Sequence, residues 1–490
     1  MDLVLYPRAA PGDRLRVWAG SFRRAQAPEL TWWLDGQPAT PRALRPISSV
    51  RSGDALPKNT PPASVPRAFA GVYEFANLQP DTRHEITVQA DGERASWSLR
   101  TLPTQVPNVL DRWFNVLLVS CFYQGEDVQG VAGTVISELK GAAQPHLTLL
   151  VGDQVYLDLP TQVIFPAEPD RLADKFEADY RRNWAGPGGF GQVLAAAPSA
   201  CIPDDHEYWN NFPNATPVVA NTWTAGGRAA WQLAARQLFE GFQRSYDGQL
   251  GDAFTLDVAP LSFFLADGRT FRDPDRRFML SRAGRDQLDA WAQRVIDGRL
   301  FGVFVSGQSL FSEPAGFFTG KIADYEMPNY QDFPQIVRAL TRIADAGRPV
   351  LCLTGDVHWG RVTEARDQIS GRTAFREIIA SPTSLVATLG AAQVATARTW
   401  LGGLLGGTAD PWPRHAAAQP APAYFAGDVT GSRFACASPA LHQQRGNHVV
   451  LLSFQQSGGG VDVRVTYYPL SLVDSIRKPI VVGPFRLRNL

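Results

Sequence analysis

The sequence predicts an α/β protein that carries a β-rich module at its N-terminus. Beyond about residue 110, short apolar runs end abruptly in polar residues or glycine, and stretches with helical spacing lie between them. Such runs are typical of strands that are buried on both faces, between layers of helices or against a second sheet. They occupy residues 114–119, 147–151, 261–266, 302–305, 350–353 and 377–380.

Two further patterns complete the predicted α/β domain. Residues 282–300 carry Leu288, Trp291 and Val295 at the spacing of a helix with one buried face. The C-terminal part of the chain is rich in alternating apolar residues, which predict further strands. These strands are expected at 449–454, 461–467 and 480–487.

The first 105 residues predict a separate β module. Segment 78–82 has the sequence LQPDT and precedes two alternating stretches, at 86–90 and 95–99. This arrangement resembles the corner and following strand of a fibronectin type III or immunoglobulin-like sandwich. Earlier strands of the same module are expected at 15–19, 30–34 and 72–75.

The proline-containing stretch 102–107 predicts a linker, so we expect one domain at 1–105 and a larger one at 106–490. Within the larger domain, residues 386–424 are rich in alanine, glycine and proline. This segment is predicted to be an irregular surface insertion or a lid over the active site.

Composition excludes several classes of protein. The 490 residues contain 47 Lys plus Arg and 47 Asp plus Glu, so no net charge attracts a polyanion and we expect no specific nucleic-acid binding. Four cysteines are too few for a disulfide framework. There is no apolar run of about 18 residues and no export signal, so we expect no transmembrane segment. The expected compartment is the cytoplasm if the chain is complete, and the periplasm or exterior if a signal was trimmed.

Side chains that bind metal ions follow four of the predicted strands. Parallel strands place their carboxyl ends at one edge of a sheet, where α/β proteins bind ligands. The four segments are Ser120-Cys121, Gly152-Asp153-Gln154-Val155-Tyr156, Asp204-Asp205-His206-Glu207 with Asn210-Asn211, and Gly355-Asp356-Val357-His358.

Each segment alone has an ordinary explanation, such as a turn, a buried cysteine or a helix cap. Together they would bury several charges without partners, and a multivalent cation resolves that conflict. Carboxylates favour hard cations, whereas a thiolate and a phenolate favour a stronger Lewis acid such as Fe(III), so a mixed-metal site is expected. Asp153 and Tyr156 would share a helical face, and Asp356 and His358 would point the same way from an extended segment.

The four segments, in this order, resemble the PhoD-type alkaline phosphatases of the calcineurin-like metallophosphoesterase superfamily. That family reads Ser-Cys, Gly-Asp-x-x-Tyr, Asp-Asp-His-Glu-x-x-Asn-Asn and Gly-Asp-x-His. Asp267-Gly268-Arg269 and Gln308 also match later family strands. The resemblance covers about residues 110–385 and implies a four-layer α/β/β/α sandwich.

The resemblance also implies roles for the matching residues. A first cation, Fe(III)-like, would be bound by Cys121, Asp153, Tyr156 and His358. Asp153 would bridge to a second, Ca(II)-like cation, with Zn and Mn as alternative metals. The remaining ligands of the second cation would be Asp205, Asn211 and Asp356, for which Asp204 and Asn210 compete.

The family's catalytic histidine corresponds to His206. The implied activity is hydrolysis of a small phosphoester by a hydroxide that the two metals and Asp153 position, chiefly as a phosphomonoesterase with possible diesterase activity. The alternatives are a phosphodiesterase acting on lipids or nucleotides, and a binding protein with a vestigial metal site. The chain departs from the family at 330–334, where YQDFP replaces Trp-Asp-Gly-Tyr-Pro, and at Trp359, which narrows the expected pocket.

Overall fold

The computed structural model describes most of the chain. The described residues are 3–51, 67–161, 164–186, 190–244, 246, 248–311, 326–384, 410–412, 433–437, 440–471, 473 and 477–488.

The first large sheet contains strands from both ends and the middle of the chain. Its ten strands lie in the order β23 (Ile480–Leu487), β22 (Gly460–Pro469), β21 (His448–Ser457), β9 (Phe114–Val119), β10 (Leu147–Val151), β11 (Ser199–Ile202), β1 (Leu3–Arg8), β2 (Leu15–Arg24), β6 (Arg67–Phe75) and β5 (Arg42–Ser49). Strands β9, β10 and β11 are parallel neighbours, so their carboxyl ends share one edge.

The second large sheet is built from the later half of the chain. Its strands are β12 (Phe254–Val258), β13 (Leu261–Leu265), β14 (Phe301–Ser306), β15 (Val350–Thr354), β17 (Thr373–Ile379), β16 (Gly360–Asp367), β19 (Phe434–Cys436) and β18 (Asp410–Trp412), with β20 (His442–Gln444) paired to β16. Strands β13, β14 and β15 run parallel.

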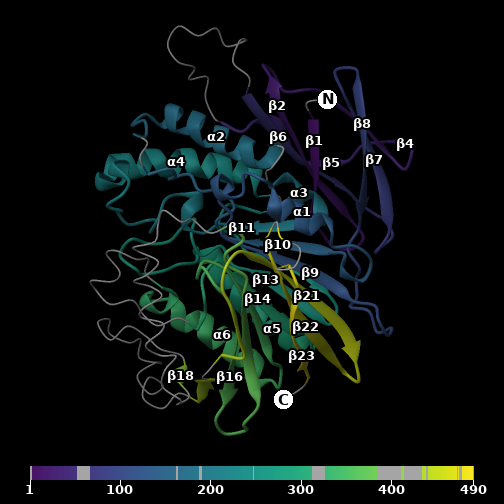
Figure 1. Ribbon diagram of the computed structural model, residues 1–490, viewed down its shortest axis with the longest axis vertical. Helices are drawn as coiled ribbons and strands as arrows, with labels where there is room; N and C mark the ends of the chain where they lie inside the picture. The colour runs from purple at the N-terminus through teal and green to yellow at the C-terminus, as the bar shows by residue number, and fades with distance from the viewer. Residues whose placement is uncertain are drawn as a thin grey trace.

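The α-helices cover the outer faces of the two sheets (Figure 1). They are α1 (Val131–Ser137), α2 (Pro169–Ala185), α3 (Gly191–Ala196), α4 (Ala225–Phe242), α5 (Arg282–Asp297) and α6 (Phe333–Asp345). Short 3₁₀ turns are η2 (Gln124–Glu126), η3 (Gly141–Ala143), η4 (Asp205–Glu207), η5 (Ala220–Trp223) and η7 (Met327–Asn329).

Alternation of side chains along the strands produces the layers. Leu118 of β9 and Val303 of β14 point into one apolar core between the two sheets. Val119, the next residue of β9, points outward into a second core with residues of α2 and α4. Phe304, the next residue of β14, does the same toward α5 and α6. The order is therefore α/β/β/α, which confirms the predicted fold class.

The N-terminal strands form a β-sandwich, as predicted. A third sheet, ordered β4 (Gln37–Ala39), β3 (Leu30–Leu34), β7 (Arg83–Ala90) and β8 (Glu93–Arg100), faces β1, β2 and β6. Val17, Trp32 and Val88 belong to the core between these sheets. The sandwich also continues the first large sheet, because Arg8 of β1 pairs in parallel with Ser199 of β11.

The boundary at residue 105 remains a prediction, and the contacts around it are extensive. The predicted linker is packed rather than exposed, since Leu102 and Val106 lie in the core between the large sheets. Trp18 Nε1 donates to the carbonyl of Gly241 at 2.8 Å, which fixes the N-terminal sheet to the end of α4. Arg8 reaches the adjacent carbonyl of Phe242 at 2.6 Å.

Most of segment 386–424, predicted as an insertion or lid, lies outside the described residues. Its described part is β18, where Trp412 is 2% exposed. The Trp412 ring packs against Phe311, Phe375 and Phe434 with centroids 5.0 to 6.2 Å away. This short stretch therefore belongs to the core of the second sheet.

Candidate metal centre

The loops after β9, β10, β11 and β15 meet at one edge of the paired sheets. The amide of Asp356, after β15, donates to Ser120 Oγ, after β9, at 3.3 Å. Two glycines permit this approach. A Cβ on Gly355 would lie 2.2 Å from Ser120 Oγ and 2.4 Å from the carbonyl oxygen of Val151, and one on Gly152 would lie 2.5 Å from the Asp204 side chain. Any side chain on the glycine of either Gly-Asp pair would clash, so these glycines allow the loops to approach as well as forming turns.

The backbone is unusual at the predicted ligands. Five of the seven have positive φ: Cys121 (54°), Asp153 (57°), Asn211 (68°), Asp356 (61°) and His358 (57°). Residues other than glycine seldom adopt this left-handed conformation, and such residues cluster at functional sites. The packing of the loops therefore holds the backbone at these five residues in a conformation that the isolated chain disfavours.

Four carboxylates converge where the loops meet. Asp153, Asp204, Asp205 and Asp356 each place an oxygen within 4.8 Å of the others, and Asp153, Asp205 and His206 form an overlapping group. The backbone N–H of Asn211 donates to Asp205 Oδ2 at 2.8 Å. Like charges this close repel strongly unless protons or a cation intervene.

The thiol of Cys121 and the phenol of Tyr156 both lie against Asp153 Oδ2. Cys121 Sγ is 3.5 Å and Tyr156 Oη is 3.4 Å from Asp153 Oδ2. Ser381 links His358 to this group, because its Oγ accepts from the His358 amide at 2.9 Å and lies 3.1 Å from Cys121 Sγ. These contacts bring Cys121 and Tyr156 next to Asp153 and tie the loop of His358 to Cys121.

Several polar atoms of this cluster are buried without a hydrogen-bond partner among the described residues: Asp204 Oδ2, Asp205 Oδ1 and His358 Nδ1. A buried acceptor left in this way costs about 1–3 kcal/mol. A metal ion binds through lone pairs that no hydrogen-bond donor occupies. These atoms therefore fit a metal ion.

The pKa shifts of the cluster also indicate that a cation would stabilise it. Burial, with Asp205 and Asp204 nearby, raises the pKa of Asp153 despite the opposing effect of His206. Burial and the neighbouring carboxylates likewise raise the pKa values of Cys121 and Asp356. Asp205 differs: burial opposes its charge, but His206 and the nearby arginines hold its pKa below the usual value. A bound cation would favour the ionised form of every group.

His206 is oriented by a residue that the motifs did not identify. Its Nδ1 lies 2.8 Å from Asp158 Oδ1, and the other oxygen of Asp158 accepts from the Asn210 amide at 2.8 Å. The His206 ring lies 4.1 Å from the Tyr156 ring, at an angle of 31°. The imidazole is therefore held on two sides, beside Asp153.

Glu207 connects the loop after β10 with the loop after β11. Its carboxylate accepts from the amides of Asp153 at 2.9 Å, Gln154 at 2.6 Å and Asp204 at 2.8 Å. Asp204 and Glu207 also form the capping box of η4, so this ordinary explanation of the Asp-Asp-His-Glu segment holds as well. The side chain of Gln243, after α4, donates to Glu207 at 3.1 Å.

Arg269 pairs with Asp204, one of the two adjacent aspartates. Its Nε pairs with Asp204 Oδ1, and its Nη1 donates to the carbonyl of Phe212 at 2.9 Å. One oxygen of Asp204 is thus occupied by Arg269, whereas Asp205 accepts from the backbone N–H of Asn211. The Asp-x-Arg pattern was the available sequence signal for Arg269, and its role needed the three-dimensional contact.

Two predicted local geometries are wrong, although the proximities they anticipated are present. Asp153 and Tyr156 do not share a helix, because residues 152–158 form bends and turns. Asp356 and His358 do not lie in an extended segment, because both have positive φ. Loop packing, rather than a regular repeat, brings each pair together.

Asp332, in the segment that departs from the family pattern, faces backbone donors. It accepts from the amides of Met279 at 2.9 Å and Leu280 at 3.1 Å, next to the start of α6. Burial raises its pKa to about 6. These contacts give Asp332 a structural role.

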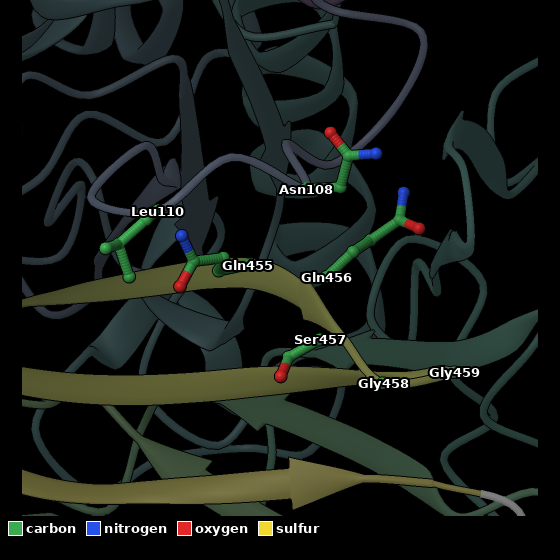
Figure 2. A pocket seen from close by; sticks show the side chains of 7 residues that line it. All are labelled: Asn108, Leu110, Gln455, Gln456, Ser457, Gly458 and Gly459. Atoms are coloured by element: carbon green, nitrogen blue, oxygen red, sulfur yellow. The ribbon is translucent and has the colours of Figure 1, made fainter.

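A hollow of about 440 Å³ lies elsewhere, beside the β21–β22 hairpin (Figure 2). It is lined by Asn108, Leu110, Gln455, Gln456, Ser457, Gly458 and Gly459. Phe454 pairs with Phe114 at the start of β9, so this hollow lies at the opposite end of that strand from Cys121. Its lining contains no charged side chain.

Among the described residues, every helix is too short or too polar to cross a bilayer. No family model and no curated protein sequence matches the chain. Comparison with solved structures does find relatives. The structure of PhoD matches with a TM-score of 0.59 and 13% identity, covering 98% of this chain and 88% of PhoD. Purple acid phosphatase PPD1 from yellow lupin (Lupinus luteus) matches with a TM-score of 0.55 and 11% identity, covering 98% of this chain and 74% of that one.

Both matches extend over nearly the whole chain, including the N-terminal sandwich. At such low identity they establish the fold and leave the chemistry to the site itself. The resemblance first noticed in four short motifs is therefore confirmed at the level of the fold: this chain has the architecture of PhoD and of a plant purple acid phosphatase.

Proposed function

We propose that this protein is a metal-dependent phosphoester hydrolase whose active site lies at the loop edge described above. The observation that carries the proposal is the convergence of Asp153, Asp205 and Asp356 from three loops, around buried polar atoms that lack hydrogen-bond partners. Cys121 lies against Asp153, and Ser381 ties the loop of His358 to Cys121. Protein side chains alone leave this cluster repulsive, and two cations would neutralise it.

We assign one set of ligands to each of two cations, and Asp153 belongs to both sets. The first cation is assigned to Cys121, Asp153, Tyr156 and His358, whose soft and phenolic donors suit Fe(III). The second is assigned to Asp153, Asp205, Asn211 and Asp356, whose oxygens suit Ca(II), with Zn or Mn as alternatives. Asp204 is assigned an orienting role because Arg269 already occupies one of its oxygens.

When bound, paired cations polarise phosphoryl oxygens and lower the pKa of a water molecule toward neutrality. The protein supplies position and protons. Asp158 holds His206 Nδ1, which leaves Nε2 to donate to a phosphoryl oxygen or to the departing alkoxide. Burial opposes the charge of His206, but Asp158, Asp205 and Asp153 together raise its pKa well above the usual value. The proposed role of His206 is therefore that of a proton donor.

The substrate is proposed to be a small phosphoester, hydrolysed as a monoester with diesterase activity as the nearest alternative. Parallel assays with p-nitrophenyl phosphate and bis-p-nitrophenyl phosphate, on protein loaded with each candidate metal, separate the two. Asp205→Ala should abolish turnover of both, whereas Asp13→Ala, at an exposed carboxylate of the N-terminal module, should not change it. Equal activity of Asp205→Ala and the wild type would refute the proposal.

A further inference from the structure

A small aromatic cluster stands beside the candidate metal centre, apart from the large cores. Tyr156 and Leu159 are both 3% exposed, and Tyr123 is half-buried against them. These three side chains form a cluster of their own, whereas the neighbouring Phe122 belongs to the core beneath the first sheet.

The cluster lies on the His206 side of the centre. The Tyr156 ring is 4.1 Å from the His206 ring, and Tyr156 Oη is 3.4 Å from Asp153. Tyr123 meets Tyr156 edge-on, with centroids 5.6 Å apart and planes at 63°. Because Tyr123 alone in the cluster keeps exposed surface, it is the part that an incoming molecule can touch.

The backbone of Tyr123 is anchored to the segment after β17, and its ring lies over Gly125. A Cβ on Gly125 would lie 2.6 Å from its ring, so the phenol lies across a residue that has no side chain. Ser384 Oγ donates to the Tyr123 carbonyl at 2.9 Å, and the Ser384 amide donates to the Cys121 carbonyl at 2.9 Å. A preordered ring loses little conformational entropy on binding, which favours its use in recognition.

The chemistry of the centre determines which part of a substrate reaches this ring. The group that protonates the departing oxygen must stand beside it, and His206 is the proposed donor. The carbon skeleton of the leaving group therefore extends toward the side chains that flank His206, which are Tyr156 and then Tyr123. Aromatic rings prefer offset or edge-to-face contacts with other planar groups.

We propose that Tyr123 forms a leaving-group subsite that selects phosphoesters of aromatic alcohols over those of small aliphatic alcohols. This inference rests on the proposed function and names the substrate class of the same site. Stacking on one ring corresponds to a preference of about 3- to 10-fold in binding or in kcat/KM.

Equilibrium binding tests the subsite without depending on turnover. The dissociation constants of phenylphosphonate and methylphosphonate are measured on the metal-loaded protein, for the wild type, Tyr123→Leu and Tyr123→Phe. The wild type should prefer phenylphosphonate, Tyr123→Phe should keep that preference, and Tyr123→Leu should lose about 3- to 10-fold of it. Tyr246→Leu, at a half-buried tyrosine far along the chain, is the matched control and should keep it.

Each result decides the inference. An unchanged ratio in Tyr123→Leu, an equal loss of affinity for both phosphonates, or no preference in the wild type overturns the subsite. Hydrolysis of phenyl phosphate and methyl phosphate by the same proteins addresses the proposed function separately. A wild type that prefers phenylphosphonate but hydrolyses neither ester would retain the subsite and refute the hydrolase.

Discussion

His206 Nδ1 lies 2.8 Å from Asp158 Oδ1, and both side chains are buried beside the carboxylate cluster. Asp158 follows Asp153 by five residues in the same loop, so one loop supplies both a predicted metal ligand and the residue that orients the histidine. The pair fixes the imidazole and favours its protonated form, as a buried carboxylate beside an imidazole does.

Removing the proposed proton donor should slow the reaction according to the leaving group. His206→Gln should lower kcat by about 10²- to 10⁴-fold for an alkyl phosphate and much less for p-nitrophenyl phosphate, whose anion needs no proton. Asp158→Asn should show the same dependence with a smaller loss. His84 makes a matched control, because its Nδ1 lies 2.8 Å from Asp35 Oδ2 in the N-terminal module. If His84→Gln and His206→Gln behave alike, the assignment of His206 is wrong.

Glu207 should matter for metal binding without touching a metal. Glu207→Gln replaces one acceptor with a donor that faces the amides of Asp153, Gln154 and Asp204. We expect metal affinity to fall about 10- to 100-fold, as for other residues that position ligands. Metal titration followed by calorimetry measures this fall. Glu168→Gln, at an exposed glutamate before α2, provides the control; equal affinities of the two variants would contradict the role.

The N-terminal strands should be required for the rest of the chain to fold. Deletion of residues 1–105 would remove Trp18 and Arg8 from the carbonyls of Gly241 and Phe242 and would expose the edge of β11. Gln243 is the next residue after Phe242, and its side chain donates to Glu207. The deletion would therefore also disturb the loops that Glu207 holds. We expect the truncated chain to aggregate or to lack a cooperative thermal transition. A truncated chain that melts cooperatively and binds metal would show that the module is dispensable.

Asp332 should make stability depend on pH in a defined direction. Its pKa is raised to about 6, above the usual value of an aspartate, so the folded state holds the proton more tightly than the unfolded state. The stabilisation is complete below about pH 4 and is lost as the pH rises to about 6. Its size is at most about 3 kcal/mol. Asp332→Asn, which stays neutral, should therefore gain stability relative to the wild type across this range, measured by thermal midpoints. A difference that does not change with pH would refute the shift.

Periodic patterns in the sequence predicted much of the fold. The runs at 114–119 and 147–151 became β9 and β10, and the helical spacing at 282–300 became α5. Burial on both faces makes such strands uniformly apolar, which is a strong local signal. The pairing of β1 with β11 had no such signal, because it depends on contacts between distant segments.

The sequence pointed to residues that converge at the candidate site, but not to the residues that support them. Cys121, Asp153 and Asp356 each follow a buried strand, so their convergence could be expected. Asp158, Glu207 and Arg269 act through long-range hydrogen bonds to backbone or side chains, which no spacing encodes. The left-handed backbone at Asp356 and His358 also arises from loop packing, and it invalidated the extended geometry expected there.

The metal content of the purified protein tests the central claim most directly. Elemental analysis after metal loading and desalting should find about two metal ions per chain in the wild type. Asp153→Ala should lose both, since Asp153 belongs to both proposed ligand sets. A wild type that retains no metal, or an Asp153→Ala variant that retains two ions, would contradict the account.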